Sequence, residues 1–351
     1  MDAATEPQRP QRRSQAAPRL WLRLSLSVLV TAVVLVVVAR EVDAVPDDLR
    51  VPLWAVPTYL ATLVLYFFAR AGRWWFLVRP LGPVRFRALL GVAFAGILWI
   101  LLLPWRLGEL VRPLLLARAT DIPFARALGS VALERVIDGL VVCAMFFAAA
   151  AALPQQLAGL YAACLAVAAV FGGLLLVLLA LAIWPRAAGA LVRRSLGRVL
   201  PGLADRLADL ARGVAEGLAA LPSPRPLLLF LAATLAYWAA NALGMWALAR
   251  GCGLDLGPAQ TAAVLAVLNL TLLIPGPPAH VGTFQLGVLG GLALFLPAEL
   301  VASRGAVYAF YLYTCQLGMI VALGLPASLR LRWGWRETLA HLRGTDLAPR
   351  T

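Results

Sequence analysis

The sequence predicts an all-α fold, a polytopic helical bundle in a membrane, and three observations support this prediction. Of the 351 residues, 62% are hydrophobic and only 14% are charged. The mean hydropathy is +0.84, well above that of a soluble globular chain. The apolar residues also fall into long stretches, which is the pattern of membrane-spanning helices.

The positive charge indicates contact with lipid. The net charge of +14 comes from arginine alone, because the sequence contains no lysine, and the arginines cluster between the apolar stretches. Such clusters follow the positive-inside rule and attract anionic head groups, so we expect membrane lipids as partners and no nucleic acid. The four cysteines lie far apart and there are only two histidines. We therefore predict no disulfide framework, no metal site and no cofactor.

Apolar stretches mark the candidate helices, and nine of them stand out: about 22–39, 51–69, 88–103, 128–152, 160–184, 227–250, 259–274, 284–297 and 305–325. Crossing the hydrocarbon layer of ~30 Å takes roughly 20 helical residues, and six of the stretches are long enough. The third, seventh and eighth are short and lie against proline or glycine breaks.

The arginine-rich connections predict the orientation of the chain. The N-terminal tail, 70–87, 185–226 and the C-terminal tail are basic and fit the cytoplasm, whereas 40–50 is acidic and fits the outside. Nine full crossings would place the two basic tails on opposite sides. We therefore predict about six full spans plus two opposed re-entrant hairpins, with both termini cytoplasmic.

The first hairpin is predicted to enter from the cytoplasm through 88–103 and return through 105–119. The second would enter from the outer side through 259–274 and return through 284–297. An alternative, in which 88–103 and one arm of the second hairpin cross fully, remains open. Residues 1–20 form a disordered basic tail in this interpretation, 21–330 the membrane domain, and 331–351 a second basic tail.

Two further segments carry local predictions. Trp74 and Trp75 directly follow an apolar stretch and are typical of an interfacial aromatic belt. Residues 186–221 repeat leucines at three- and four-residue steps, which predicts an amphipathic cytoplasmic helix bent at Pro201. We favour a helix that lies on the membrane or packs on the protein over one that binds a partner.

The stretch PWRLGELVRP (104–113) places charge next to an apolar run. Arg106, Glu109 and Arg112 are spaced i, i+3, i+6 and share roughly one face of a helix that starts after Pro104. A charge at the bilayer centre costs a few kcal/mol, so such residues usually face the bundle interior and pair.

The stretch LERVIDG (133–139) supplies the complementary charges. Glu134, Arg135 and Asp138 lie about two turns into an apolar helix. Together with the first stretch they make three arginines and three carboxylates, which sum to zero. Two compatible hypotheses follow: the six residues neutralise one another, or Arg106 and Arg112 bind a lipid phosphate, which suits guanidinium, while the carboxylates orient them.

The third motif is LNLTLLIPGPPAHVGTFQLG (268–287). Its prolines break the helix, which is tolerated at membrane depth only inside protein or beside a water-filled cavity. A helix that restarts near Gly282 and Thr283 would point its amides at an anion, and His280 is a candidate donor or proton-sensitive group. We therefore add His280, Gly282 and Thr283 to the candidate phosphate-binding residues.

These motifs, in this order, resemble the lysylphosphatidylglycerol synthase transmembrane-region family. The resemblance rests on RAGRWWFLVRPLG, on the stretch from LPWRLGELVRP to ALERVIDGL, and on IPGPPAHVGTFQ, and it covers about residues 20–330. It implies a membrane module that moves phospholipid or a related anionic lipid, as a flippase does. Some relatives continue into a soluble aminoacyl-transferase domain, and because this sequence ends at Thr351 we expect no lipid aminoacylation.

The functional prediction is a multi-pass protein of the bacterial cell membrane that binds and translocates an anionic phospholipid or related lipid phosphate. We find no GxSxG, Walker or DxD motif, so we favour a non-enzymatic role. The alternative is a membrane enzyme, or its accessory subunit, acting on a polyprenyl phosphate or phospholipid. A purely structural role and a homo-oligomer also remain open.

Overall fold

The computed structural model describes residues 51–103, 108–150, 158–196, 201–219, 224–274 and 278–331, all within one compact unit. This part of the chain is 88% helical and contains no strand, which confirms the all-α prediction. The N-terminal tail, the predicted first span, Arg106, Pro275 and nearly all of the C-terminal tail lie outside the described residues.

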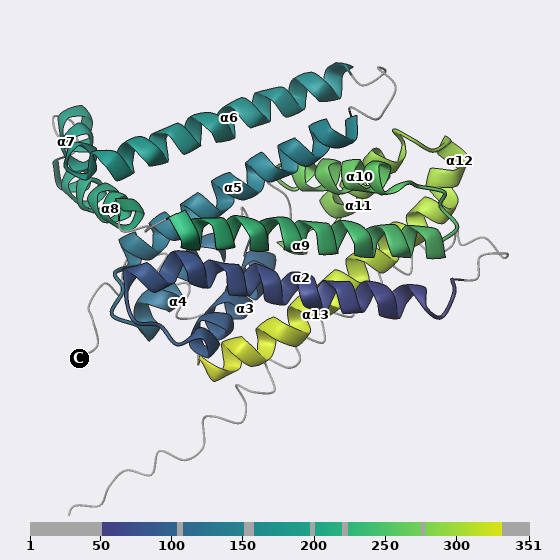
Figure 1. Ribbon diagram of the computed structural model, residues 1–351, viewed down its shortest axis with the longest axis horizontal. Coiled ribbons are helices and arrows are strands. Elements are labelled where there is room, and N and C mark those ends of the chain that lie inside the picture. Colours follow the sequence, from purple (N-terminus) through teal and green to yellow (C-terminus); the bar gives the residue numbers. More distant parts are fainter. Residues whose placement is uncertain are drawn as a thin grey trace, which may run out of the picture. The chain divides into compact units, whose positions relative to one another are not determined.

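The described helices follow one another along the chain, and Figure 1 labels the α-helices among them. They are α2 (Ala55–Val78), η2 (Arg79–Leu81), α3 (Phe86–Leu102), α4 (Val111–Ala119), α5 (Phe124–Ala150), α6 (Ala158–Ile183), α7 (Pro185–Leu196), α8 (Pro201–Ala219), α9 (Pro224–Gly251), α10 (Pro258–Thr271), η4 (Pro278–His280), α11 (Thr283–Leu292), α12 (Ala298–Leu300), the π-helical turn η5 (Val301–Gly305) and α13 (Ala306–Arg330).

Helix length separates the candidate spans from shorter elements. Among the described residues, four segments are long and apolar enough to cross a membrane, namely Ala55–Leu81, Tyr161–Ile183, Pro224–Gly251 and Ala298–Arg330. Helix α5 has 27 residues and is long enough to cross, but it contains several charged side chains and is therefore not among these four segments. Helices α3, α10 and α11 have 17, 14 and 10 residues, which confirms that these three apolar stretches are short.

Close helix contacts depend on glycine. Helix α2 lies along α9, where a Cβ on Gly244 would overlap the Thr62 hydroxyl. Helix α13 lies along α3, where a Cβ on Gly324 would come within 2.6 Å of Leu98 Cβ. Small residues of this kind let helix backbones approach closely, which is how packing stabilises bundles that lack a hydrophobic driving force between helices.

Two pairs of short helices each form a hairpin. Helices α10 and α11 pack together, and α3 packs against α4. A Cβ on Gly108 would overlap the backbone of Trp99, so the chain returns against α3 at a distance that only glycine allows. Element η4, at the turn of the second hairpin, contacts α3. The turn of the second hairpin therefore lies beside the first hairpin.

The segment over 186–221 differs from the single bent helix that the sequence predicts. It forms two helices, α7 and α8, which pack against each other, while residues 197–200 between them lie outside the described part. Helix α8 also packs on α5, where a Cβ on Gly213 would overlap Ala125. The segment therefore packs on the protein, in line with the favoured alternative.

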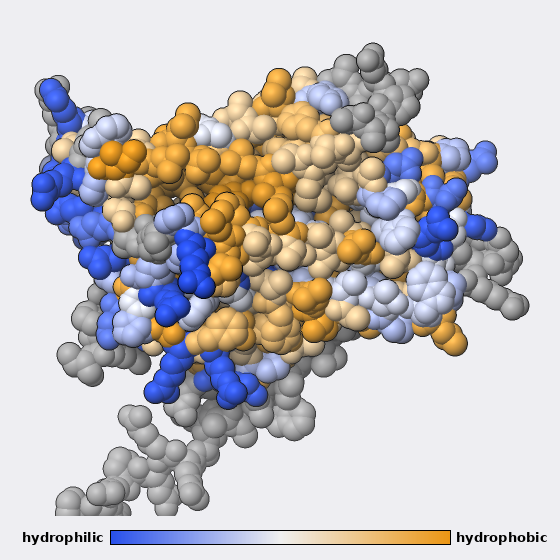
Figure 2. Space-filling view, in the orientation of Figure 1, coloured by the Kyte–Doolittle hydropathy of each residue, from blue (hydrophilic) through white to orange (hydrophobic). Residues whose placement is uncertain are grey.

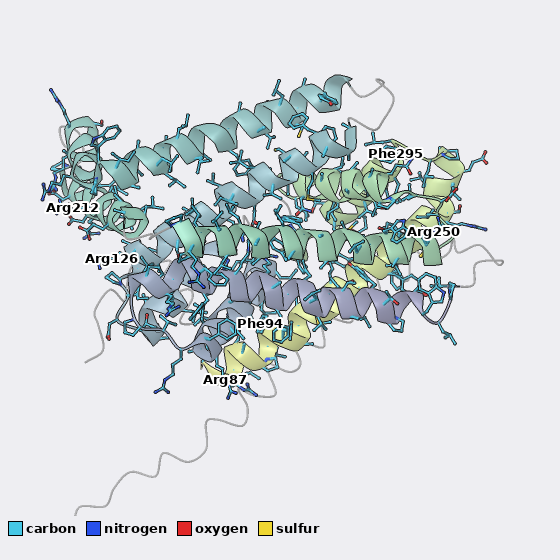
Figure 3. The ribbon with its side chains drawn as sticks, in the orientation of Figure 1. Arg87, Phe94, Arg126, Arg212, Arg250 and Phe295 are labelled. Carbon is cyan, nitrogen blue, oxygen red and sulfur yellow. The ribbon has the colours of Figure 1, made fainter. Side chains whose placement is uncertain are left out.

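The surface separates into an apolar belt and polar ends. Figure 2 shows hydrophobic side chains across the middle of the helices and hydrophilic ones toward the left and right of the view. Arg126 and Arg212 lie toward the left end and Arg250 toward the right end (Figure 3). Helix α6 is the most exposed candidate span, with only 6% of its apolar window buried, as expected for a helix that faces lipid.

Candidate functional site

Helix α2 brings an arginine into the bundle interior that the sequence analysis assigned to a connection. The helix continues past residue 69 to Val78, so Arg73 and Trp74 are 1% and 0% exposed. The interfacial prediction for Trp74 is therefore wrong, as is the placement of Arg73 in a cytoplasmic connection. The apolar face of α2 continues through Ala71, Trp74 and Leu77. Arg73 can lie inside the bundle because it donates hydrogen bonds to the buried side chains of Thr234 and Glu134.

Glu134 of α5 is the centre of the buried charge network. Its carboxylate is fully buried and accepts hydrogen bonds from three arginines. Arg73 Nη2 donates at 3.0 Å and Arg135 Nη2 at 2.5 Å, both to Oε1. Arg112 donates from Nη1 at 3.1 Å to Oε1 and from Nη2 at 2.9 Å to Oε2. One carboxylate thus connects α2, α4 and α5.

Asp138, one turn further along α5, extends this network to α9. It accepts hydrogen bonds from Arg73 Nη2 at 2.7 Å and from the Tyr237 hydroxyl at 2.5 Å, and its ion pair with Arg135 Nη2 spans 3.1 Å. The Tyr237 ring also lies under the Arg73 guanidinium, with 4.3 Å between Cζ and the ring centroid. Thr234 accepts a further hydrogen bond from Arg73 Nη1 at 2.8 Å. Charge-assisted bonds therefore hold α2, α5 and α9 together.

Arg112 is enclosed by its neighbours. Its side chain is 2% exposed, and its guanidinium lies 4.4 Å from the centroid of the Trp74 ring. On α3, the bare backbone of Gly96 makes room for the arginine stem, because a Cβ there would overlap Arg112 Cγ. These contacts match the hypothesis that Arg112 neutralises a carboxylate. Phosphate binding by Arg112 stays a prediction, and it would have to compete with Glu134.

A cavity of about 380 Å³ adjoins the network. Its charged and titratable lining comes from α2, α5, α9, α13 and the two hairpins and consists of Tyr66, Arg70, Glu109, Arg135, Asp138, Tyr237, His280 and Tyr313. Glu109, beside the first hairpin's turn, forms an ion pair with Arg135 Nη1 at 3.5 Å. The three sequence motifs therefore meet at one cavity. Glu134 and Arg112 do not line the cavity, but Glu134 accepts hydrogen bonds both from Arg112 and from Arg135, which does line it.

The second hairpin turns through an unusual backbone. Ala279 and His280 have φ values of 59° and 56°, and Gly282 has φ of 82°. Helix α11 begins at Thr283, which confirms the predicted restart. The Gly282 amide donates to Gln285 Oε1 at 2.8 Å, and the Thr283 hydroxyl donates to the His280 carbonyl at 3.0 Å. His280 lines the cavity, whereas Gly282 and Thr283 do not, and anion binding by the three residues stays a prediction.

Sequence reasoning missed Arg70, Arg73 and Tyr237. Arg70 and Arg73 are spaced i, i+3 immediately after an apolar stretch, and the apolar residues between and after them were the available signal for a continuing helix. Tyr237 lies within the apolar stretch 227–250, where a hydroxyl requires a partner. Its partner, Asp138, is 99 residues away in sequence, which periodicity does not reveal.

The comparison with known families assigns the chain. Residues 21–343 match the family described as the lysylphosphatidylglycerol synthase TM region. The chain belongs to this family. The match covers nearly the whole chain and confirms the resemblance found in its motifs. The family comprises membrane proteins related to lipid biosynthesis and lipid flippases, and the apolar helices agree with a multi-pass membrane protein. Searches among curated proteins and among solved structures find no match.

Proposed function

We propose that this protein translocates an anionic phospholipid or a related lipid phosphate across the membrane. The cavity is the observation that supports the proposal. Charged side chains of α2 and α5 and residues of both hairpins line it, and it lies among apolar helices. A lipid head group loses its hydration when it enters the hydrocarbon layer, at a cost of several kcal/mol per charge. A cavity lined by charges would replace that hydration.

The proposal includes a topology of six spans and two re-entrant hairpins, with both tails in the cytoplasm. Helix α11, with 10 residues, is about 15 Å long at 1.5 Å per residue, which is half of the hydrocarbon layer of ~30 Å. Helix α10 is also too short to span. Arginine-rich α7 and α8 lie at the end of the molecule marked by Arg126 and Arg212, so we assign this end to the cytoplasm (Figures 1 and 3).

Arg135 is the residue of the central network that we assign to the lipid phosphate. Its side chain is 23% exposed and lines the cavity, unlike that of Arg112. Its contact with Glu109, at 3.5 Å, is the longest ion pair in the network among the described residues. A phosphate that enters the cavity would compete with Glu109 for Arg135 Nη1, while Glu134 and Asp138 keep the arginine in place. Glu109 would then link lipid binding to the first hairpin.

A vesicle assay tests this function. Purified protein is reconstituted into phosphatidylcholine vesicles that contain acyl-labelled phosphatidylglycerol, and the label that reaches the outer leaflet is measured with a membrane-impermeant quencher. We expect the native protein to move the label and Arg135→Gln to move it about tenfold more slowly, which corresponds to about 1.4 kcal/mol of lost binding in the transition state.

The matched control is Arg126→Gln, which removes the same charge from the same helix. Arg126 pairs with Glu216 at the surface, where both side chains are 42% exposed, so we expect the native rate. Recovery of chemically unchanged lipid separates translocation from the alternative of a membrane enzyme. The proposal fails if the native protein moves no label, or if folded Arg135→Gln moves it at the native rate.

A further inference from the structure

We infer that Arg70 is the head-group selectivity residue of this cavity and binds the phosphodiester of a lipid with one net negative charge. The inference rests on the proposed function, because it takes the ligand of the cavity to be a lipid. It adds a role for Arg70, which lies in the motif RAGRWWFLVRPLG but was not among the candidate phosphate-binding residues of the sequence analysis.

The charge balance of the interior singles out Arg70. Among the described residues of the network, three arginines face three carboxylates: Arg73, Arg112 and Arg135 with Glu109, Glu134 and Asp138. Arg70 is an additional cation. Its Nη1 donates to the Tyr66 hydroxyl at 3.0 Å, and its Cζ lies 5.9 Å from the same ring. It forms no ion pair with a carboxylate in the part of the chain that the structure describes.

An arginine without a carboxylate partner favours an anionic ligand. A charge at membrane depth is costly unless a counter-charge accompanies it, and a lipid phosphate in the cavity would be that counter-charge. Guanidinium binds two phosphate oxygens at once through its planar donors. Arg70 retains such donors, because its buried Nε has no acceptor among the described residues. Among the described residues, one phosphodiester would balance the charge of Arg70, whereas a zwitterionic head group would leave that charge unbalanced.

Polar atoms on α9 indicate what accompanies the phosphate. Asn241 and Trp238 line the same cavity and are 4% and 5% exposed. Within the described ranges, Asn241 Oδ1 receives no hydrogen bond and Trp238 Nε1 donates none. Buried polar atoms usually have partners, so one acceptor and one donor here indicate a ligand with hydroxyl groups. A glycerol head group would satisfy both atoms, so phosphatidylglycerol is the probe for the role of Arg70.

Lipid retention measured by native mass spectrometry tests the inference independently of transport. The purified full-length protein is equilibrated with equal amounts of phosphatidylglycerol and phosphatidylcholine that carry the same acyl chains. We expect the native protein to retain phosphatidylglycerol about tenfold more than phosphatidylcholine, Arg70→Gln to retain both equally, and Arg70→Lys to keep part of the preference.

Two control variants separate the position of the charge from its mere presence. Arg79→Gln deletes the same charge from the end of the same span, where Arg79 stacks on the Trp75 ring at 4.9 Å, and should keep the native preference. Tyr66→Phe keeps the charge of Arg70 but removes the hydrogen bond that orients its side chain, and should weaken the preference less than Arg70→Gln does.

The outcomes separate this inference from the proposed function. Equal retention of both lipids by the native protein overturns the inference whether or not any variant folds, and so does a native preference in Arg70→Gln. If the native protein moves no lipid in vesicles but shows a preference that depends on Arg70, the translocation proposal fails and the assignment of Arg70 stands.

Discussion

Replacement of Glu134 by glutamine should destabilise the protein more than any other single neutralisation of a carboxylate in the described chain. The substitution keeps the shape of the side chain but removes the charge that faces Arg73, Arg112 and Arg135. It also places an amide donor against guanidinium donors. Removal of one partner of a buried ion pair costs about 3–5 kcal/mol, because the remaining charge is left buried without compensation.

The expected change in thermal stability follows from this free energy. At a lower limit of about 2 °C per kcal/mol for a domain of a few hundred residues, the loss lowers the unfolding midpoint by about 6 °C or more. Thermal unfolding in detergent, followed by size-exclusion chromatography, measures the midpoint. Glu216→Gln is the matched control, since its exposed pair with Arg126 contributes less than about 1 kcal/mol.

A double-mutant cycle sharpens this test. Arg112→Gln combined with Glu134→Gln removes both members of the bidentate pair, so the double variant should be less destabilised than the sum of the two single variants by about 1–3 kcal/mol. If Glu134→Gln unfolds within about 1 °C of the native protein, or if the two changes are additive, Glu134 is not the centre of the network.

Two further predictions concern α3 and the topology. Gly96→Ala should destabilise the protein by about 1–3 kcal/mol, because the added Cβ overlaps the Arg112 side chain. Gly91→Ala on the same helix is the control: its Cβ meets no atom within 4 Å, so the variant should be neutral or slightly stabilising. Equal unfolding midpoints of the two variants would exclude the close contact between Gly96 and Arg112. Arg126→Cys should react with a membrane-impermeant thiol reagent only from the cytoplasmic side and Arg250→Cys only from the outer side, and labelling of both from one side would exclude the proposed topology.

The sequence was sufficient for the membrane class, the short helices and the charge motifs. Apolar length and proline breaks are local properties, so the short helices at 88–103, 259–274 and 284–297 were found within a few residues. The neutralisation of PWRLGELVRP by LERVIDG followed from the cost of charge at membrane depth, and the pairing of Arg112 with Glu134 agrees with it.

The composition of the network could not be predicted in the same way. The positive-inside rule places an arginine that follows an apolar stretch in the cytoplasm, and Arg73 was assigned there for this reason. The rule uses local sequence only, so it takes no account of partners on other helices. Those partners, Glu134 and Thr234, are 61 and 161 residues away in sequence. The same limit applies to α7 and α8, because the leucine repeat continues through Pro201 and gives no sign that the two helices fold against each other.

The most direct test of the central claim is to obstruct the cavity without changing any charge. Leu273 lines the cavity and is 42% exposed, so Leu273→Trp should reduce its free volume without disturbing the core. Leu176 is 69% exposed on α6 and carries the same substitution as the control. Transport of acyl-labelled phosphatidylglycerol in vesicles should fall at least tenfold in Leu273→Trp and stay at the native rate in Leu176→Trp. Native transport by a folded Leu273→Trp variant would show that lipid does not pass through this cavity.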